Sequence, residues 1–195
     1  MIRFRTIPSI FRPIVYMVLL GLLNEIICYL FFFSSGNAVP NNIYLFIETL
    51  LFVWQFRLWK NVVWNKDIFL GLMLFLIAMW IIDYIALGNI VKYSLLYPVS
   101  SSFILILLSV NQLNWLIVND RSPIIKNPIF IICCAVILFF SYKIMAEVFY
   151  YYAPEQTIKK NIFVYEAYLN VVYNILLFIA ILCIVPRKVF IKPLQ

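Results

Sequence analysis

The chain contains no histidine, only four glycines and only eight acidic residues among its 195 positions. Histidine is the commonest general base and metal ligand of proteins, so this chain lacks the side chain most often used for either role. No GxGxxG or P-loop sequence is present to hold a phosphate. The four cysteines lie in apolar runs without CxxC spacing, and we interpret them as small packing residues. We therefore expect no metal site and no cofactor.

Charged residues are also scarce, at 12% of the chain against 66% hydrophobic residues. A soluble domain averages about a quarter charged residues. Six runs reach the roughly 20 residues that a helix needs to cross the hydrocarbon core of a bilayer. The predicted fold is an all-α integral membrane protein, a six-transmembrane-helix bundle that forms one polytopic domain over residues 1–195. We place its helices at about 13–33, 42–60, 68–87, 94–118, 128–152 and 161–185.

The basic residues are distributed unevenly between the two sides of this bundle. Eleven lysines and arginines fall in the N-terminal segment, the second and fourth connections and the C-terminal segment, against three in the other connections. Cytoplasmic loops carry the excess of lysine and arginine, so we predict that both termini are cytoplasmic. The net charge of +7 then reflects topology, and we expect the lipid bilayer, not nucleic acid, as the surrounding partner.

The abundance of isoleucine, phenylalanine, tyrosine, asparagine and lysine is typical of proteins from AT-rich bacterial genomes. We therefore expect a multi-pass protein of the inner, or plasma, membrane of a bacterial cell.

Polar and charged side chains interrupt the apolar runs, and most of the charges fall in the half nearest the predicted outer surface. Such groups are costly in a bilayer and mark a polar interior or a functional site. At 1.5 Å per residue, five acids and one lysine lie in this outer half, whereas the inner half has amides. The predicted pocket residues are Asn24, Glu25, Glu48, Asp83, Lys143, Glu147, Glu166, Asn170 and Asn174.

Lys143 and Glu147 lie four residues apart, on one face of the fifth predicted helix. A local ion pair, with the lysine reaching toward the lipid headgroups, is one interpretation of them. Local pairing leaves the other four acids without a cation, however. We therefore favour an outward-opening acidic pocket in which Lys143 is the one fixed cation.

A one-sided pocket without catalytic motifs is typical of a ligand-sensing, receptor-like protein that works through a cytoplasmic or membrane protein partner. The excess of acids favours a small cationic ligand. One alternative is a transporter or channel for a cation or small amine, although the one-sided acids lack the symmetry of inverted repeats. A second alternative is an intramembrane enzyme that uses paired carboxylates on a lipid-linked substrate. We expect a non-enzymatic role.

Overall fold

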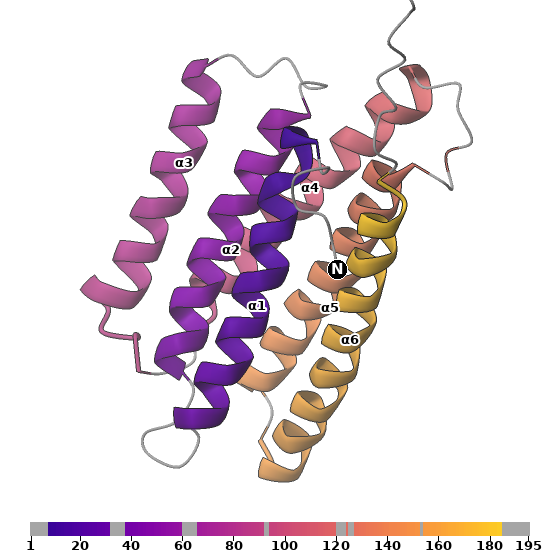
Figure 1. The fold of residues 1–195 in the computed structure, drawn as a ribbon. Helices are drawn as coiled ribbons and strands as arrows, with labels where there is room; N and C mark the ends of the chain where they lie inside the picture. Colours follow the sequence, from indigo (N-terminus) through magenta and orange to yellow (C-terminus); the bar gives the residue numbers. More distant parts are fainter. Residues whose placement is uncertain are drawn as a thin grey trace, which may run out of the picture.

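The computed structural model describes residues 8–31, 38–59, 66–91, 94–119, 124, 127–152 and 154–184. These ranges are almost entirely helical and contain no strand (Figure 1). A short 3₁₀ turn, η2 (Ser9–Phe11), precedes the first helix, and a π-helical segment, η3 (Ile81–Ala86), continues the third. The six long helices are α1 (Arg12–Phe31), α2 (Ala38–Leu58), α3 (Lys66–Trp80), α4 (Leu96–Asn119), α5 (Pro128–Tyr152) and α6 (Gln156–Leu182).

Five helical stretches are long and apolar enough to cross a membrane, which is typical of a multi-pass α-helical membrane protein in contact with lipid. The helix α2 has a similar length but is less apolar. Its polar side chains Glu48, Thr49 and Gln55 are all buried inside the protein. The five stretches are Ser9–Leu30, Lys66–Ala86, Leu96–Asn119, Pro128–Tyr152 and Val164–Leu182.

Three helix ends differ from the predicted positions. The helix α2 begins at Ala38 rather than near residue 42, because Pro40 is tolerated in a first helical turn, where its missing N–H has no partner to lose. The helix α6 begins at Gln156 rather than near residue 161, so its first turn is polar. The third predicted helix ends in the wider turns of η3, which change the direction in which its last side chains point.

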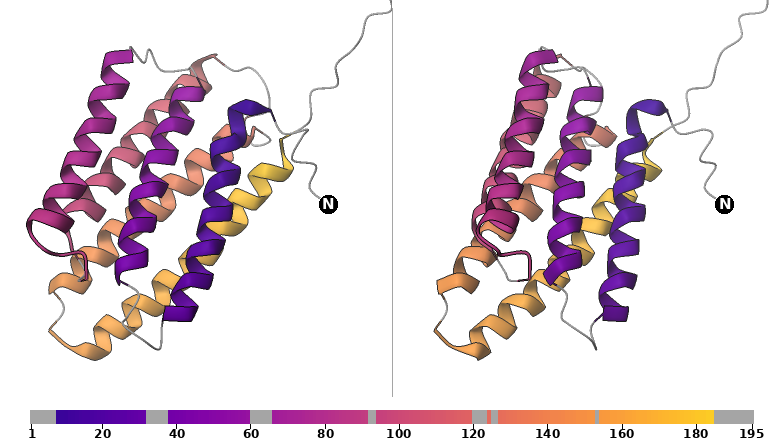
Figure 2. Two further views of the ribbon diagram at one scale, coloured as in Figure 1. Left: turned by 60° about the vertical axis from the view of Figure 1, so that its left-hand side comes forward. Right: turned by 90° about the vertical axis from the view of Figure 1, so that its left-hand side faces the viewer.

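Successive helices run in opposite directions (Figures 1 and 2). The starts of α1, α3 and α5 and the ends of α2, α4 and α6 therefore meet at one end of the bundle. Arg12, Arg57 and Lys66 lie at this end, which we call the basic end. The opposite end, where α1 finishes and α6 begins, is called the distal end.

The apolar core fills the half of the bundle next to the basic end. Ile14 of α1, Phe52 of α2 and Ile132 of α5 belong to it and are fully buried. The rings of Phe52 and Phe140 meet edge to face, with centroids 5.9 Å apart. In a membrane such dispersion contacts, rather than exclusion of water, hold helices together. Apolar contacts consequently dominate the packing of this half of the protein.

Gln55, one of the predicted inner amides, supports the start of α1. Its side-chain nitrogen donates a hydrogen bond of 2.6 Å to the Ile10 carbonyl, and its oxygen accepts one of 3.3 Å from the Ile14 N–H. The first N–H groups of a helix have no partner within it, so the amide satisfies one of them in the interior. Gln55 thus has a structural role at the basic end.

Candidate functional site: an acidic cavity at the distal end

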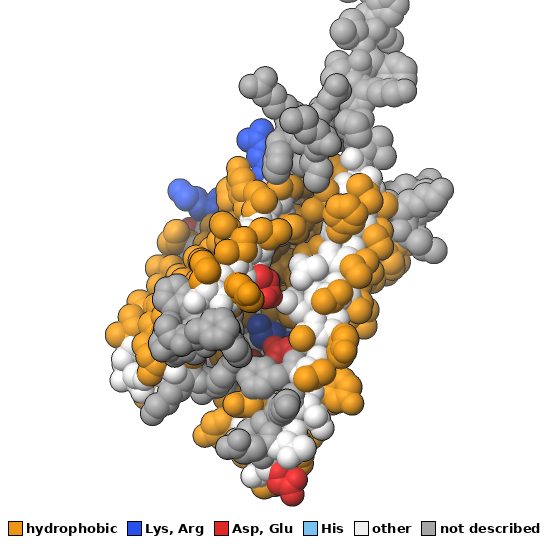
Figure 3. All heavy atoms as spheres, turned by 60° about the horizontal axis from the view of Figure 1, so that its bottom comes forward, with side chains coloured by type: hydrophobic (Ala, Val, Ile, Leu, Met, Phe, Trp, Pro, Cys, Tyr) orange, Lys and Arg blue, Asp and Glu red, His pale blue; other side chains and the backbone are white. Residues whose placement is uncertain are grey.

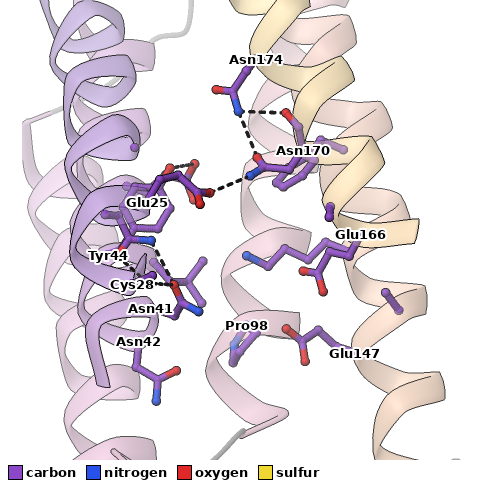
Figure 4. Close-up of a pocket in the computed structure, with 18 of the residues that line it drawn as sticks. Glu25, Cys28, Asn41, Asn42, Tyr44, Pro98, Glu147, Glu166, Asn170 and Asn174 are labelled. Atoms are coloured by element: carbon purple, nitrogen blue, oxygen red, sulfur yellow. Dashed lines mark hydrogen bonds between the residues drawn. The ribbon is translucent and has the colours of Figure 1, made fainter. Parts of the chain in front are cut away.

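A cavity of about 820 Å³ lies between the helix pair α1 and α2 and the helix pair α5 and α6 (Figure 4). Ser94 and Pro98, next to the start of α4, close it on a third side. Figure 3 views the distal end and shows acidic and basic side chains gathered in a central hollow, with hydrophobic side chains on the helices around it. The cavity therefore opens at the distal end and stops at the apolar core.

The cavity brings together residues that are far apart in the sequence. Eight of the nine predicted pocket residues line it, and Asp83 does not. The eight are Asn24 and Glu25 of α1, Glu48 of α2, Lys143 and Glu147 of α5, and Glu166, Asn170 and Asn174 of α6.

Glu48 is the most buried acid of the cavity lining, with 3% of its surface exposed. The Tyr44 hydroxyl, one helical turn away, donates a hydrogen bond of 3.0 Å to one carboxylate oxygen. Gly21 of α1 lies beside this hydroxyl, and a Cβ at this position would meet it at 3.4 Å, an ordinary van der Waals contact. Within the described ranges, the other Glu48 oxygen accepts no hydrogen bond, so it remains available to a bound molecule.

Lys143 does not form a close local pair with Glu147. Its ammonium lies 5.8 Å from the centroid of the Phe139 ring and 5.9 Å from that of Phe140, at the limit of a cation–π contact. It interacts electrostatically with both Glu48 and Glu147, but no carboxylate among the described residues comes within the 4.0 Å of an ion pair. Its charge thus acts on carboxylates of both α2 and α5, and no close ion pair within its own helix neutralises it.

Glu25 and Asn170 connect the two walls of the cavity. The Asn170 side-chain nitrogen donates a hydrogen bond of 3.4 Å to the Glu25 carboxylate (Figure 4). Asn174, one turn further along α6, donates to the Asn170 carbonyl at 2.8 Å. Over the described residues, α1 and α6 touch along a short stretch only. The Glu25–Asn170 hydrogen bond therefore links two helices that have little other contact among the described residues.

The wall formed by α1 and α2 contains polar groups that the sequence analysis did not select. The Asn24 side-chain nitrogen donates a hydrogen bond of 3.0 Å to the Asn41 side-chain oxygen, and the Cys28 thiol lies 3.2 Å from the same oxygen. We expected residue 41 in a loop and Cys28 in an apolar contact. An earlier start of α2 places Asn41 in its first turns, facing α1.

Asp83 lies behind the cavity and is fully buried. Its carboxylate accepts hydrogen bonds from the Asn89 amide at 3.2 Å, from the Ser94 hydroxyl, and from the Tyr97 N–H at 2.8 Å. Tyr97 is in the first turn of α4, where N–H groups lack helical partners and negative charge is favoured. Asp83 therefore anchors the start of α4, and through Ser94 it supports a wall of the cavity without lining it.

The carboxylates of the cavity do not converge on one point. In the part of the chain that the structure describes, no three cysteine, aspartate or glutamate side chains lie close enough to hold a metal ion. The arrangement suits a molecule that contacts several groups spread over the walls, not one compact ion.

No family model, curated protein or solved structure matches this chain. The cavity and its surroundings are consequently the basis on which a function is argued.

Proposed function

We propose that the chain is a six-span membrane protein with both termini in the cytoplasm, and that it is a ligand-sensing, receptor-like component that binds a small cationic ligand at the outer face and acts through a protein partner. A crossing by α2 is compatible with its lower apolarity, because its buried polar side chains face protein rather than lipid. The alternating directions of the helices also require α2 to cross if α1 and α3 do.

The orientation rests on the basic residues. Arg12, Arg57 and Lys66 lie at the basic end, and the helices that flank residues 60–65 and 120–123 also end there. Lysine and arginine are retained on the cytoplasmic side during insertion, so the basic end is the cytoplasmic one. The cavity then opens to the outside of the cell or to the periplasm.

The observation that carries the proposal is the one-sided cavity. A carrier must present its site to both sides of the membrane, and a channel needs a continuous polar path. Here the acidic side chains of the lining reach no further than Glu48, and beyond it Phe52 and Phe56 of the same helix are buried in the apolar core. A receptor needs only a pocket on one side and two arrangements of its helices that a ligand binds with different affinity.

The lining favours a positive ligand, with four glutamates against one lysine. A carboxylate out of water is stable only when a charge or several hydrogen bonds compensate it. The Tyr44 hydroxyl compensates one oxygen of the buried Glu48, and the exposed Glu25 accepts a hydrogen bond from the Asn170 amide. A bound cation would supply the compensation that these groups leave incomplete.

The proposal is tested with the full chain in lipid nanodiscs, incubated with choline, ethanolamine, putrescine and spermidine. We expect at least one of these cations to raise the unfolding temperature of the wild type and of Glu155→Gln, an exposed acid outside the cavity. The same cation should have no effect on Glu48→Gln.

Proteoliposomes of the same protein should show no uptake of the stabilising cation and no proton flux under a membrane potential. Saturable uptake that Glu25→Gln abolishes would overturn the receptor in favour of a transporter. Turnover of a lipid-linked amine would favour the enzyme, and no stabilisation by any of the four cations would remove the proposed ligand class.

A further inference from the structure

We infer that the ligand of the acidic cavity is an extended organic polyamine, one of whose ammonium groups takes the place of the Lys143 ammonium beside Glu48 and Glu147. This inference rests on the proposed function and adds the chemical class of the ligand and the group that it displaces.

The charge of the lining indicates more than one positive group. Four glutamates and one lysine give a formal charge of −3 when all are ionised, that is, four negative charges less one positive. A ligand with a single charge leaves most of this excess in place. A zwitterion adds no net charge at all. Two or three ammonium groups on one molecule match the excess.

The spacing of the carboxylates indicates that these positive groups are separated. Glu166 lies one helical turn, about 6 Å along the axis, from Asn170, which holds Glu25. Glu147 is separated from Lys143 by the same rise along α5. Since no three acidic groups of the described residues converge, a metal ion or compact cation would reach only part of the set. A flexible chain of amines can reach acids on both walls within a cavity of about 820 Å³.

A position for one ammonium group is already built into the cavity. Glu48, a side chain with only 3% exposure, lines the cavity, and one of its carboxylate oxygens accepts no hydrogen bond from the described residues. Beside it, the Lys143 ammonium lies over the rings of Phe139 and Phe140. Lysine is itself an alkylammonium group on a methylene chain, so the site that accepts it has the chemistry to accept an alkylamine. Because this lysine makes no close ion pair, its displacement breaks no short contact.

Displacement of Lys143 also provides a route from the ligand to the helices. Phe139 stacks on Tyr173 of α6, with centroids 4.3 Å apart and planes inclined by 15°. A change in the position of the Lys143 side chain therefore acts on a ring pair that joins α5 to α6. Tyr173 is buried and belongs to the apolar core, so the contact lies between the cavity and the basic end.

The test is calorimetric titration of the full chain in nanodiscs with spermidine, choline, phosphocholine and Mg²⁺ as probes. Spermidine should bind at least tenfold more tightly than choline, and phosphocholine and Mg²⁺ should not compete with it. Glu48→Gln and Glu166→Gln should each weaken spermidine binding at least tenfold, because the two acids lie on opposite walls.

The decisive variant is Lys143→Met. If the lysine is a resident counter-ion that the ligand displaces, its removal should tighten spermidine binding about tenfold. If Lys143 instead binds an anionic group of the ligand, its removal weakens binding, and the inference is wrong. Lys66→Met removes the same charge at the basic end, outside the cavity, and should leave the affinity unchanged. Lys143→Gln gives the same readout should the methionine variant not fold.

The outcomes also separate this inference from the proposed function. If choline binds as tightly as spermidine, the inference of a polyamine ligand is wrong, but the proposal of a cation-sensing protein stands. Tighter binding of phosphocholine, which has no net positive charge, overturns both the polyamine and the cationic ligand class. Absence of binding by every cation overturns both.

Discussion

The Asn170 side-chain nitrogen lies 3.4 Å from a Glu25 carboxylate oxygen and donates the hydrogen bond that joins α6 to α1 across the cavity. The two residues are 145 positions apart in the chain, and their helices touch along a short stretch only in the described structure. Because this hydrogen bond is long, it holds α1 and α6 together only weakly at this side of the cavity. It is the contact that a ligand between the two walls would strengthen or replace.

The first prediction concerns this contact. In a double-mutant cycle of Glu25→Ala and Asn170→Ala, we expect a coupling energy of about 0.6 kcal/mol, the usual value for a hydrogen bond between membrane helices. The measurement is reversible unfolding in mixed micelles. Asn111, exposed on α4 outside the cavity, provides the control, since Glu25→Ala and Asn111→Ala should be additive. Additivity of the first pair would show that the contact has no energetic role.

The second prediction concerns the sharing of Lys143. If Glu147 alone neutralises Lys143, the double variant Lys143→Met, Glu147→Gln should recover the stability that each single variant loses. The reason is that an unpaired buried charge is the costly state. Among the described residues the ammonium forms no close ion pair with Glu48 or Glu147, and its charge acts on both carboxylates. We therefore expect the double variant to remain destabilised, and Lys143→Met with Glu48→Gln to show a coupling of at least about 0.5 kcal/mol.

Suppose that the Lys143→Met, Glu147→Gln protein recovers full stability and that Lys143→Met and Glu48→Gln are additive. Lys143 would then pair with Glu147 alone. Both results are read from the same unfolding experiment, so the wild type, three single variants and two double variants decide between the interpretations.

The sequence was sufficient to place six helices and to select eight of the residues that line the cavity. Long apolar runs identify helices whatever their neighbours are, because the bilayer fixes their length. Charged side chains within such runs have to face protein or water, which explains why acids as distant in sequence as Glu25 and Glu166 line one cavity. The depth of a residue along its helix, and the need of a charged side chain to avoid lipid, can both be predicted from one sequence.

The direction of a side chain around its helix was less predictable. Asp83 has the depth of a cavity residue, but it lies in the π-helical segment η3 and points to the start of α4. A π-helical turn contains more residues than an α-helical one, so the regular angle per residue no longer applies. Asn41 was missed because α2 begins four residues before the apolar run, and helix starts are set by local capping and packing rather than by hydropathy.

The third prediction concerns Asp83 as the anchor of α4. Asp83→Asn keeps the size of the side chain but replaces an acceptor of three hydrogen bonds by an amide, which cannot accept at both positions. Hydrogen bonds to a charged group contribute about 1.5–3 kcal/mol, so we expect a loss of stability of roughly this size. Asp67→Asn, an exposed acid in the first turn of α3, should cost less than about 1 kcal/mol.

The Asp83 variant should also bind the cavity ligand less tightly, since Ser94 lines the cavity and is held by Asp83. Unchanged stability with lost binding would instead place Asp83 in direct contact with the ligand.

The last prediction concerns the side of the membrane on which the cavity opens. The test uses a protein whose native cysteines are replaced and which has a single new cysteine at Glu155 or at Asp67. Glu155 lies at the distal end, before α6, and Asp67 lies at the basic end, in the first turn of α3. Both positions are exposed. If the basic end is cytoplasmic, a membrane-impermeant maleimide should label only the Glu155 variant in intact cells. Permeabilised cells should give labelling of both, which controls for expression and for access at the bilayer surface. Labelling of only the Asp67 variant in intact cells would invert the protein, and the acidic cavity would then open toward the cytoplasm and its metabolites instead of the cell exterior.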